Sequence, residues 1–432
     1  MATADKNAYQ LMTTAELDAT ISELERKVDD IAAQGLKLDM ARGKPSPEQV
    51  ALSRPMLDMV TSETVLVDEG MPVDNYGVPD RLPSARRLAA QILGVDPANV
   101  VVNGSSSLNL MHDAITNAYV RGIAGCKPWS QQGTVKFLCP SPGYDRHFAV
   151  SASFGIENVP VPMRADGPDM DEVVRLVESD PQVKGIWCVP KYANPTGVVY
   201  SDEVVRRFAT LKPAAPDFRI FWDNAYAVHG FTGEDEPLLN IFDAIEEAGG
   251  GNLVYEFGST AKVTFPSSGI AFITASPIDM VDLRSAFAIE RVSPEKFSQL
   301  AHALFLKDLD GVKAQMARHA AIVRPRFELV ERKLTEGLAE LGIASWTHPK
   351  GGYFVSFDGP EGSAKKTVGL MKELGVIMTG AGATWPYGVD PHDTNIRIAP
   401  TYPSLDELGA ALDVFVVVVQ LVAARLERAS RA

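Results

Sequence analysis

The sequence predicts an α/β fold, in which a mostly parallel sheet is sandwiched by helices and a smaller α+β domain is built from both ends of the chain. Two observations predict it. Short, fully apolar runs alternate with helical patterns from about Val100 to Ile273, which is typical of a parallel sheet covered on both faces. Beyond Ile289 the pattern becomes helical. We place an N-terminal segment at 1–60, a large domain at 61–305 and a small domain at 306–432, which the N-terminal segment joins.

The composition excludes several classes of function. The formal net charge of −14 argues against nucleic acid or an anionic membrane surface as a partner. Three cysteines, Cys126, Cys139 and Cys188, lack the spacing of metal ligands, so we expect buried thiols, no metal site and a reducing, cytoplasmic compartment. The N-terminus has no signal-peptide pattern, and the apolar run Phe415–Val419 is too short to span a bilayer.

The first elements supply two candidate ligand-binding loops. A capping-box pattern at Thr13–Glu16 precedes apolar residues at helical spacing, so an amphipathic helix opens the fold. The next loop contains Gly43 and Lys44 beside two prolines, and Tyr76 stands in a later rigid turn. By chemistry alone, the loop of Gly43 and Lys44 is more often a solvated connection.

The large domain contains six apolar runs that we expect to form strands. They are Val100–Val102, Val135–Leu138, Gly185–Val189, Arg219–Trp222, Leu253–Phe257 and Ile270–Ile273. Open α/β sheets bind their ligands at the carboxyl ends of the strands. The residues directly after each run are therefore the candidates for function.

Lys262 follows the run Leu253–Phe257 after a few small residues. A lysine held away from bulk water loses its proton more readily and becomes a nucleophile, as Schiff-base lysines do. The alternative is a solvated loop lysine, because lysine is mostly exposed in proteins. Only partners elsewhere in the chain decide between the two.

Two further runs end in segments suited to an aromatic phosphate ester. After Val100–Val102 come Ser105 and Ser106, where backbone N–H groups, hydroxyl groups and a helix dipole offer a phosphate site. Plain helix capping by serine is the alternative. After Val135–Leu138 comes Tyr144 on a rigid turn, where its ring either stacks on a flat cofactor or lies on the surface.

The central runs are followed by Asn194 and by Asp223 with Tyr226. An aspartate directly after a buried strand is partly desolvated, which costs free energy unless a cation or donor meets it. A pyridinium nitrogen is such a partner, and Asn194 and Tyr226 each donate hydrogen bonds suited to a phenolic oxygen on the same ring. Helix capping and turn formation are the alternative roles.

The small domain carries a candidate carboxylate-binding arginine. We expect strands at Gly351–Phe357 and Asn395–Ala399. If Ile396 and Ile398 face the core, Arg397 faces the opposite side, which is solvent or a cleft. In a cleft, its two-pronged donor face is suited to a carboxylate.

The ordered set Gly104–Ser107, Asn194–Gly197, Asp223 with Tyr226, Ser259 with Lys262, and Arg397 resembles the pyridoxal-phosphate-dependent aminotransferases of fold type I. Within them the chain looks most like the divergent aspartate aminotransferase subgroup called MocR-type aminotransferases. The resemblance covers about residues 42–403. It implies a mostly parallel seven-stranded sheet and a transaminase that moves an amino group between an amino acid, aspartate or glutamate, and a 2-oxo acid.

The resemblance also implies roles for the cofactor-binding residues. Lys262 would hold pyridoxal 5′-phosphate as a Schiff base and carry the proton at the substrate α-carbon, and Asp223 would keep the pyridine nitrogen protonated. Tyr226 would act with them, binding the ring hydroxyl oxygen together with Asn194, and Tyr144 would stack on the ring. The residues expected at the phosphate are Ser105, Ser106, Ser259 and, from the neighbouring subunit of a homodimer with shared active sites, Tyr76.

Substrate binding follows from the same resemblance. Gly43 and Arg397 would receive the α-carboxylate next to Asn194, and Lys44 is one of four candidate cations for a second carboxylate. The other three are Arg42, Arg81 and Arg146. One departure from the family pattern stands after Lys262, where Pro266–Ile270 offers no arginine for the phosphate.

Other functions stay open at this stage. A pyridoxal-phosphate-dependent lyase, or an enzyme resembling 1-aminocyclopropane-1-carboxylate synthase, would use the same residues and form other products. A ligand-sensing regulator of the MocR type would need a DNA-binding module before the cofactor domain. Because only about forty residues precede Gly43, and the chain is acidic, we expect no such module.

Overall fold

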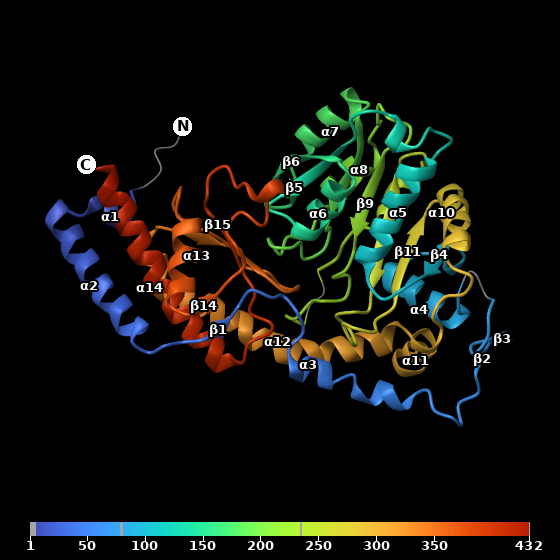
Figure 1. Cartoon of the computed structure of the whole chain (residues 1–432), viewed down its shortest axis with the longest axis horizontal. Helices are drawn as coiled ribbons and strands as arrows, with labels where there is room; N and C mark the ends of the chain where they lie inside the picture. Colours follow the sequence, from blue (N-terminus) through green and yellow to red (C-terminus); the bar gives the residue numbers. More distant parts are fainter. Residues whose placement is uncertain (1–5, 78–80, 234–235, 432) are drawn as a thin grey trace.

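The computed structural model describes residues 6–77, 81–233 and 236–431 and has the predicted α/β architecture (Figure 1). Its large sheet has eight strands, seven of them longer than two residues. In sheet order they are β4 (Val100–Val102), β11 (Ala271–Ala275), β10 (Val254–Ser259), β9 (Arg219–Asp223), β8 (Val183–Cys188), β5 (Lys136–Ser141), β6 (Glu157–Arg164) and β7 (Gly167–Pro168). Strands β10, β9, β8, β5 and β6 are parallel, and β11 runs antiparallel to both of its neighbours.

Helices cover both faces of this sheet, as the apolar runs predict. On β9, Phe221 packs on one face with Tyr255 and Phe257, while Ile220 and Trp222 belong to the core on the other face. The first face is covered by α5 (Ser107–Arg121), α6 (Asp145–Ser153) and α10 (Pro277–Glu290), and the second by α7 (Met170–Ser179), α8 (Asp202–Ala209) and α9 (Ile241–Glu247). α4 (Pro83–Leu93) packs over β4 and β11.

Two neighbouring strands of the large sheet, β6 and the two-residue β7, are missing from the six predicted runs. β6 contains Pro160 and Pro162, and only some of its residues are buried. Along most of its length it pairs only with β5, because β7 meets just its last two residues. Proline is tolerated at such a sheet edge, where its missing N–H is not needed, and the prolines hide the strand in the sequence.

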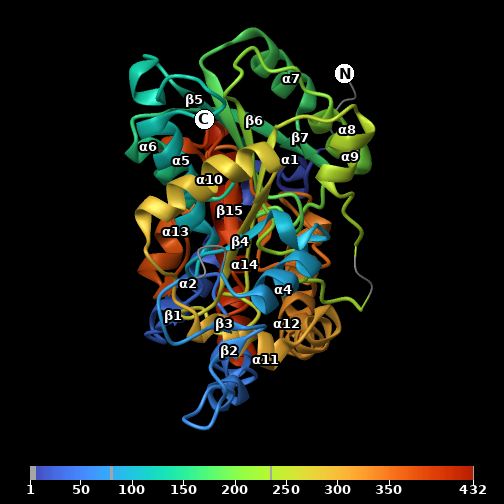
Figure 2. The same ribbon diagram turned by 90° about the vertical axis from the view of Figure 1, so that its right-hand side faces the viewer.

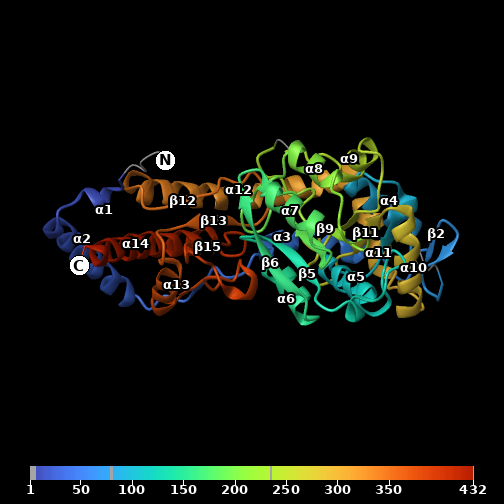
Figure 3. The same ribbon diagram turned by 90° about the horizontal axis from the view of Figure 1, so that it is seen from above.

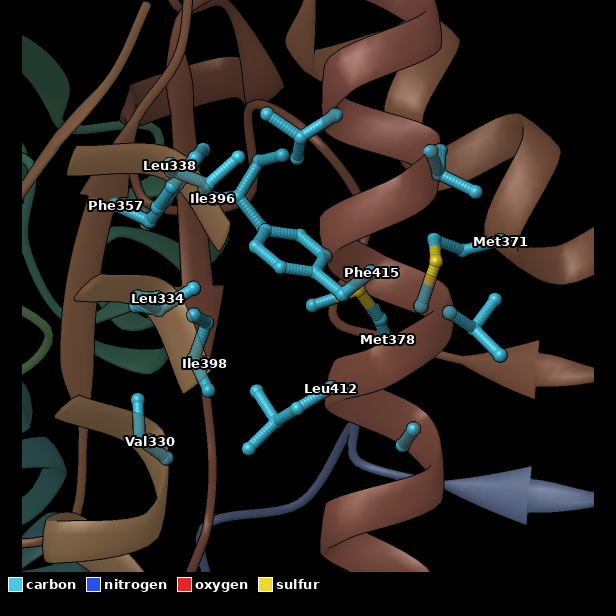
Figure 4. Close-up of a cluster of buried hydrophobic side chains, with 14 of the residues drawn as sticks. Val330, Leu334, Leu338, Phe357, Met371, Met378, Ile396, Ile398, Leu412 and Phe415 are labelled. Carbon is cyan, nitrogen blue, oxygen red and sulfur yellow. The ribbon is translucent and has the colours of Figure 1, made fainter. Parts of the chain in front are cut away.

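The second part of the molecule is built around a three-stranded antiparallel sheet. Its strands are β12 (Ser345–Trp346), β13 (Val355–Asp358) and β15 (Asn395–Ile398). The helices around it are α12 (Leu309–Leu338), α13 (Ala364–Glu373) and α14 (Leu405–Ser430). Their buried side chains form one core, in which Phe357, Ile396 and Phe415 meet (Figure 4).

Both ends of the chain meet in this second part, which lies beside the large sheet (Figure 3). α2 (Thr14–Ala32) begins with the predicted capping box at Thr13 and packs along α14, where Arg428 pairs with Asp18 at 2.7 Å. The remaining elements are α1 (Ala8–Leu11), β1 (Leu38–Asp39), α3 (Pro47–Ala51), β2 (Val67–Asp68), β3 (Met71–Pro72), α11 (Phe297–Leu306) and β14 (Val376–Ile377).

α14 is the one helix in the described parts of the chain that is long and apolar enough to cross a membrane. Of its most apolar window, 61% is buried inside the protein, and residues such as Leu412 and Phe415 belong to the core. This burial is what a core helix requires, in agreement with the buried helix predicted there.

The predicted strand at Gly351–Phe357 begins later than expected, at Val355. Gly351 and Gly352 lie instead against Tyr192, where a Cβ added to Gly351 would come within 2.4 Å of the ring and one added to Gly352 within 2.9 Å of Cβ. Close approach of the backbone to this tyrosine explains both glycines. Cys139 and Cys188 are buried as expected, whereas Cys126 is partly exposed.

Glu256 on β10 provides a test of how the large sheet responds to pH. Burial raises the pKa of its carboxyl from 4.5 to about 8, although the amide of Asn224, which donates to it at 2.9 Å, lowers this pKa. The folded protein therefore holds a proton that the unfolded chain releases, so stability falls as pH rises from about 4.5 to about 8.

Glu256→Gln should remove this loss because glutamine keeps the shape and the acceptor but never ionises. Thermal unfolding across pH should show the variant equal to the wild type near pH 4 and a few degrees more stable near pH 9. A variant that gains nothing at high pH would show that the Glu256 carboxyl is already ionised there without cost.

Candidate active site

The candidate residues follow strands whose carboxyl ends lie at one edge of the large sheet. β9 ends at Asp223, which pairs in register with Phe257 of the neighbouring β10. Asn224 N donates to Phe257 O at 2.8 Å, which fixes this register. Lys262 lies in the turn after β10, so the structure brings Asp223 and Lys262 to the same edge, as the sequence predicts.

Asp223 is an aspartate with one unpartnered oxygen, and only 3% of its surface is exposed. Its Oδ2 accepts a hydrogen bond from His147 Nε2 at 3.0 Å. The ring of His147 is in turn stacked on Trp187, with centroids 4.5 Å apart. Oδ1 of Asp223 is buried and accepts no hydrogen bond from the described residues. Such an oxygen costs free energy unless a cationic or N–H donor meets it.

Lys262 and two tyrosines share the buried space around Asp223. The Lys262 Nζ lies 4.9 Å from the ring centroid of Tyr226, and burial lowers the pKa of this lysine while the charge of Asp223 opposes the shift. Burial, followed by Tyr144 and Asp223, raises the pKa of Tyr226. Burial and then Asp223 also raise the pKa of Tyr144, to about 12. Because the charge of Asp223 affects the pKa of Lys262, Tyr226 and Tyr144, all four groups lie in one site.

The serines after β4 do not cap the following helix. Ser106 is the N-cap residue of α5, yet its side chain makes no capping hydrogen bond. Ser259 Oγ donates to Ser105 O at 2.9 Å, and Ala261 N donates to Ser259 Oγ at 3.0 Å, so the two serine segments lie side by side. A long helix whose first N–H groups lack a side-chain cap is suited to an anion.

A cation lies near this serine loop, although not where the family pattern puts one. Ser267 and Ser268 are exposed after Lys262. Arg291 instead donates to Asn103 Oδ1, and an added Cβ on Gly104 would lie 3.7 Å from its Nη1. Arg291 also pairs with Asp113 at 3.4 Å, which offsets part of its charge. No local pattern in the sequence points to Arg291, because the contact joins segments far apart in the chain.

Arg397 is buried against polar partners rather than exposed to solvent. Ile396 and Ile398 belong to the core, and Arg397 on the opposite side of β15 is only 9% exposed. Its guanidinium donates to Asn194 Oδ1 at 3.2 Å, to Asp145 Oδ1 at 3.3 Å and to a threonine hydroxyl, and its Nε is buried without a described acceptor. The structure thus joins Arg397 to Asn194, as the sequence predicts.

Gly43 and this arginine both lie against one aromatic ring, that of Phe354. A Cβ at Gly43 would lie 2.1 Å from Cζ of Phe354, so no larger residue fits without moving the ring. The guanidinium of Arg397 lies 4.7 Å from the centroid of the same ring. Gly43 therefore packs directly beside the carboxylate-binding candidate.

Two sequence-based candidates point elsewhere. Lys44 Nζ lies 3.8 Å above the ring of Tyr402, and its side chain is held there by this cation–π contact. Tyr76 is 76% exposed on the outer surface. Of the other cations considered for a second carboxylate, Arg42 and Arg146 are exposed and Arg81 is buried.

Sequence reasoning also gave no role to His147 and Phe354, which touch Asp223 and Arg397. His147 stands one helical turn after Tyr144, at the start of α6. That spacing places both side chains on one face of the helix, which is the signal that could have found His147. Phe354 has no such local signal.

Comparison with known proteins gives a consistent result. Residues 12–431 match the aspartate amino-transferase family. An aspartate aminotransferase of Corynebacterium glutamicum is 42% identical over 403 residues, which cover 93% of each chain. The crystal structure of an aspartate transaminase from Corynebacterium glutamicum has a TM-score of 0.94 at 40% identity, covering 97% of this chain and 99% of that one.

A more distant structure shares the fold alone. It is the α-aminoadipate aminotransferase LysN from Thermus thermophilus, complexed with N-(5′-phosphopyridoxyl)-L-leucine, with a TM-score of 0.71 and 20% identity. It covers 95% of this chain and 96% of its own.

Proposed function

This chain belongs to the aspartate aminotransferase family and is a transaminase, and from that premise we propose that it moves an amino group between aspartate or glutamate and a 2-oxo acid. We propose pyridoxal 5′-phosphate as its cofactor and Lys262 as the residue that binds it. The observation that carries this proposal is the buried Asp223, whose free Oδ1 lies in the same site as a lysine with a lowered pKa.

The described residues fit this cofactor, which aminotransferases of this family use. Pyridoxal phosphate supplies a carbonyl for the amine and a ring that withdraws electrons when its nitrogen is protonated. The unpartnered Asp223 Oδ1 is suited to that N–H⁺, and Tyr226 and Asn194 are suited to the ring oxygen. Ser105, Ser106 and Ser259 surround the uncapped start of α5, which is suited to the phosphate.

The chain's own residues then divide the work. Burial lowers the pKa of Lys262 and so favours its neutral form. In this form Lys262 serves as the base that takes and returns the proton at the substrate α-carbon. Arg397 holds the α-carboxylate, for which its buried Nε and two amino groups offer a planar fork. Tyr144 shields one side of the site from water.

Aspartate or glutamate is the finer part of the proposal. Its support is the relative named aspartate aminotransferase at 42% identity. A second carboxylate needs a cation, for which Arg42 and Arg146 are exposed candidates, whereas Lys44 would have to leave the ring of Tyr402. A lyase or a cyclopropane-forming synthase would use the same groups, so the products decide between them.

We also propose a cytoplasmic homodimer, with residues 61–305 as the cofactor-binding domain and 1–60 with 306–432 as the smaller one. The support is a group of exposed apolar residues on the segments around β3 and α10, two elements on the side of the molecule that faces the viewer in Figure 2. Tyr76 and Val292 are 76% and 80% exposed, and Ser293 Oγ donates to Gly77 O at 3.5 Å, so both lie on one surface. Val65, Val67, Ile289 and Phe297 are exposed on the same segments. Closed two-fold pairing is the commonest way to cover such a face.

Wild-type protein should transfer the amino group of aspartate or glutamate to a 2-oxo acid faster than that of alanine, kynurenine or aromatic amino acids. Lys262→Ala should lower this rate by at least about 10³-fold because both the attachment point and the base are lost. A coupled assay measures the rates and product analysis detects lyase products.

Borohydride reduction with peptide mapping should find the pyridoxyl group on Lys262, and a label on Lys191 would overturn the assignment.

Tyr76 should serve the partner's site. If so, mixing Tyr76→Phe chains with Lys262→Ala chains creates hybrid dimers with one intact site and one doubly damaged site. The mixture should be more active than the sum of the two separate preparations. If subunit exchange is shown, Tyr76→Phe alone is impaired and mixing restores nothing, then Tyr76 acts within its own chain.

A further inference from the structure

Lys262 sits in a single turn of backbone that needs outside support. Val263 N and Thr264 N both donate to Thr260 O, at 2.8 and 2.9 Å. A single turn leaves its later carbonyl groups without donors of its own, and Val263 is buried away from water. The carbonyl of Val263, the residue directly after Lys262, must therefore find donors elsewhere.

These donors come from α12. His319 Nε2 lies 3.0 Å from Val263 O, and Gln315 Nε2 lies 3.3 Å from it. Because a carbonyl only accepts, His319 must carry its proton on Nε2. Burial lowers the pKa of His319 to about 4, so the ring is neutral at ordinary pH and Nδ1 is an acceptor. Gln49 Nε2 donates to that Nδ1 at 3.1 Å.

Gln49 extends this series of hydrogen bonds from His319 toward the loop that contains Gly43. Its Nε2 also lies 3.3 Å from the Tyr353 hydroxyl, and its Oε1 accepts from Ser46 N at 3.0 Å. Ser46 starts α3 and stands shortly after Gly43, which packs beside Arg397 through Phe354. Hydrogen bonds thus run without a break from Ser46, shortly after Gly43, to the carbonyl group of Val263, the residue that follows Lys262.

We propose that His319 is a positioning residue for Lys262: it fixes the Val263 peptide group, and so the direction of the lysine side chain, and ties it to the Gly43 loop through Gln49. The proposal rests on the proposed function, in which Lys262 is the reacting lysine. His319 itself touches neither substrate nor cofactor.

His302 offers a matched control for this role. It is also buried, its pKa is also lowered to about 4 by burial, and it contacts the same turn through the Thr264 hydroxyl at 2.8 Å. Its hydrogen-bond partners among the described residues are Thr264 and Ser298, and it does not bond the carbonyl of Val263. Loss of His302 should therefore cost stability without redirecting the lysine.

Two substitutions at His319 separate its two bonds. His319→Gln places an amide N–H close to the position of Nε2 and keeps the donor to Val263 O. His319→Asn is shorter, reaches only the position of Nδ1 and loses that donor. Gln315, which also lies on α12, is the other donor to Val263 O. It is not substituted in either variant.

The first readout is the reactivity of Lys262 in cofactor-free protein, measured as the pH dependence of labelling by an acylating reagent with mass spectrometry of the Lys262 peptide. His319→Asn should let the amine turn toward water and raise its pKa, and one pKa unit means about tenfold less labelling at neutral pH. His319→Gln and His302→Asn should keep the wild-type profile, while thermal unfolding reports the stability of each variant.

The second readout is turnover. His319→Asn should lower kcat about tenfold or more with little change in KM, because misplacement of the base affects the reacting geometry rather than binding. Equal labelling profiles in wild type and His319→Asn, or the same shift in His302→Asn, would overturn the proposal. If Lys262→Ala stays active, the proposed function fails, while the labelling result still decides how His319 positions the lysine.

Discussion

The active site depends on two groups of opposite charge at the ends of neighbouring strands, the buried Asp223 and the partly buried Lys262. Asp223 and Lys262 are held at the same sheet edge by the register of β9 and β10. Burying each group costs free energy, so the surrounding residues must either neutralise it or leave it ready for a ligand. His147 meets one oxygen of Asp223, the other has no described donor, and burial favours the neutral form of Lys262.

The second part of the molecule supplies the anion-binding side of this site. Arg397 faces Asn194 because the flanking isoleucines of β15 are anchored, on the opposite side of the strand, in the core that α12 and α14 cover. Phe354 then fills the space between Arg397 and the backbone of Gly43. α12 extends from this core to Val263 beside the lysine, so one helix contacts both parts of the site.

Features that depend on local pattern could be predicted from the sequence. The apolar runs predicted most of the strands of the large sheet. The small or polar residues after these runs predicted Asp223, Lys262 and the serine loop as site residues. The sequence did not predict β6 because its prolines are typical of a loop, although proline is tolerated at that edge of the sheet. Phe354, Arg291 and His319 act through contacts between distant segments, which no local pattern reveals, whereas the spacing from Tyr144 is a local signal for His147.

The most direct test of this account is the turnover of Asp223→Asn. Asparagine keeps the shape and an acceptor for His147 but removes the charge that would hold a proton on the cofactor ring. The account predicts that kcat falls by about 10²–10³-fold or more, while the cofactor-free protein unfolds at a temperature no lower than wild type because a buried charge has gone. A variant with near-native kcat would contradict it.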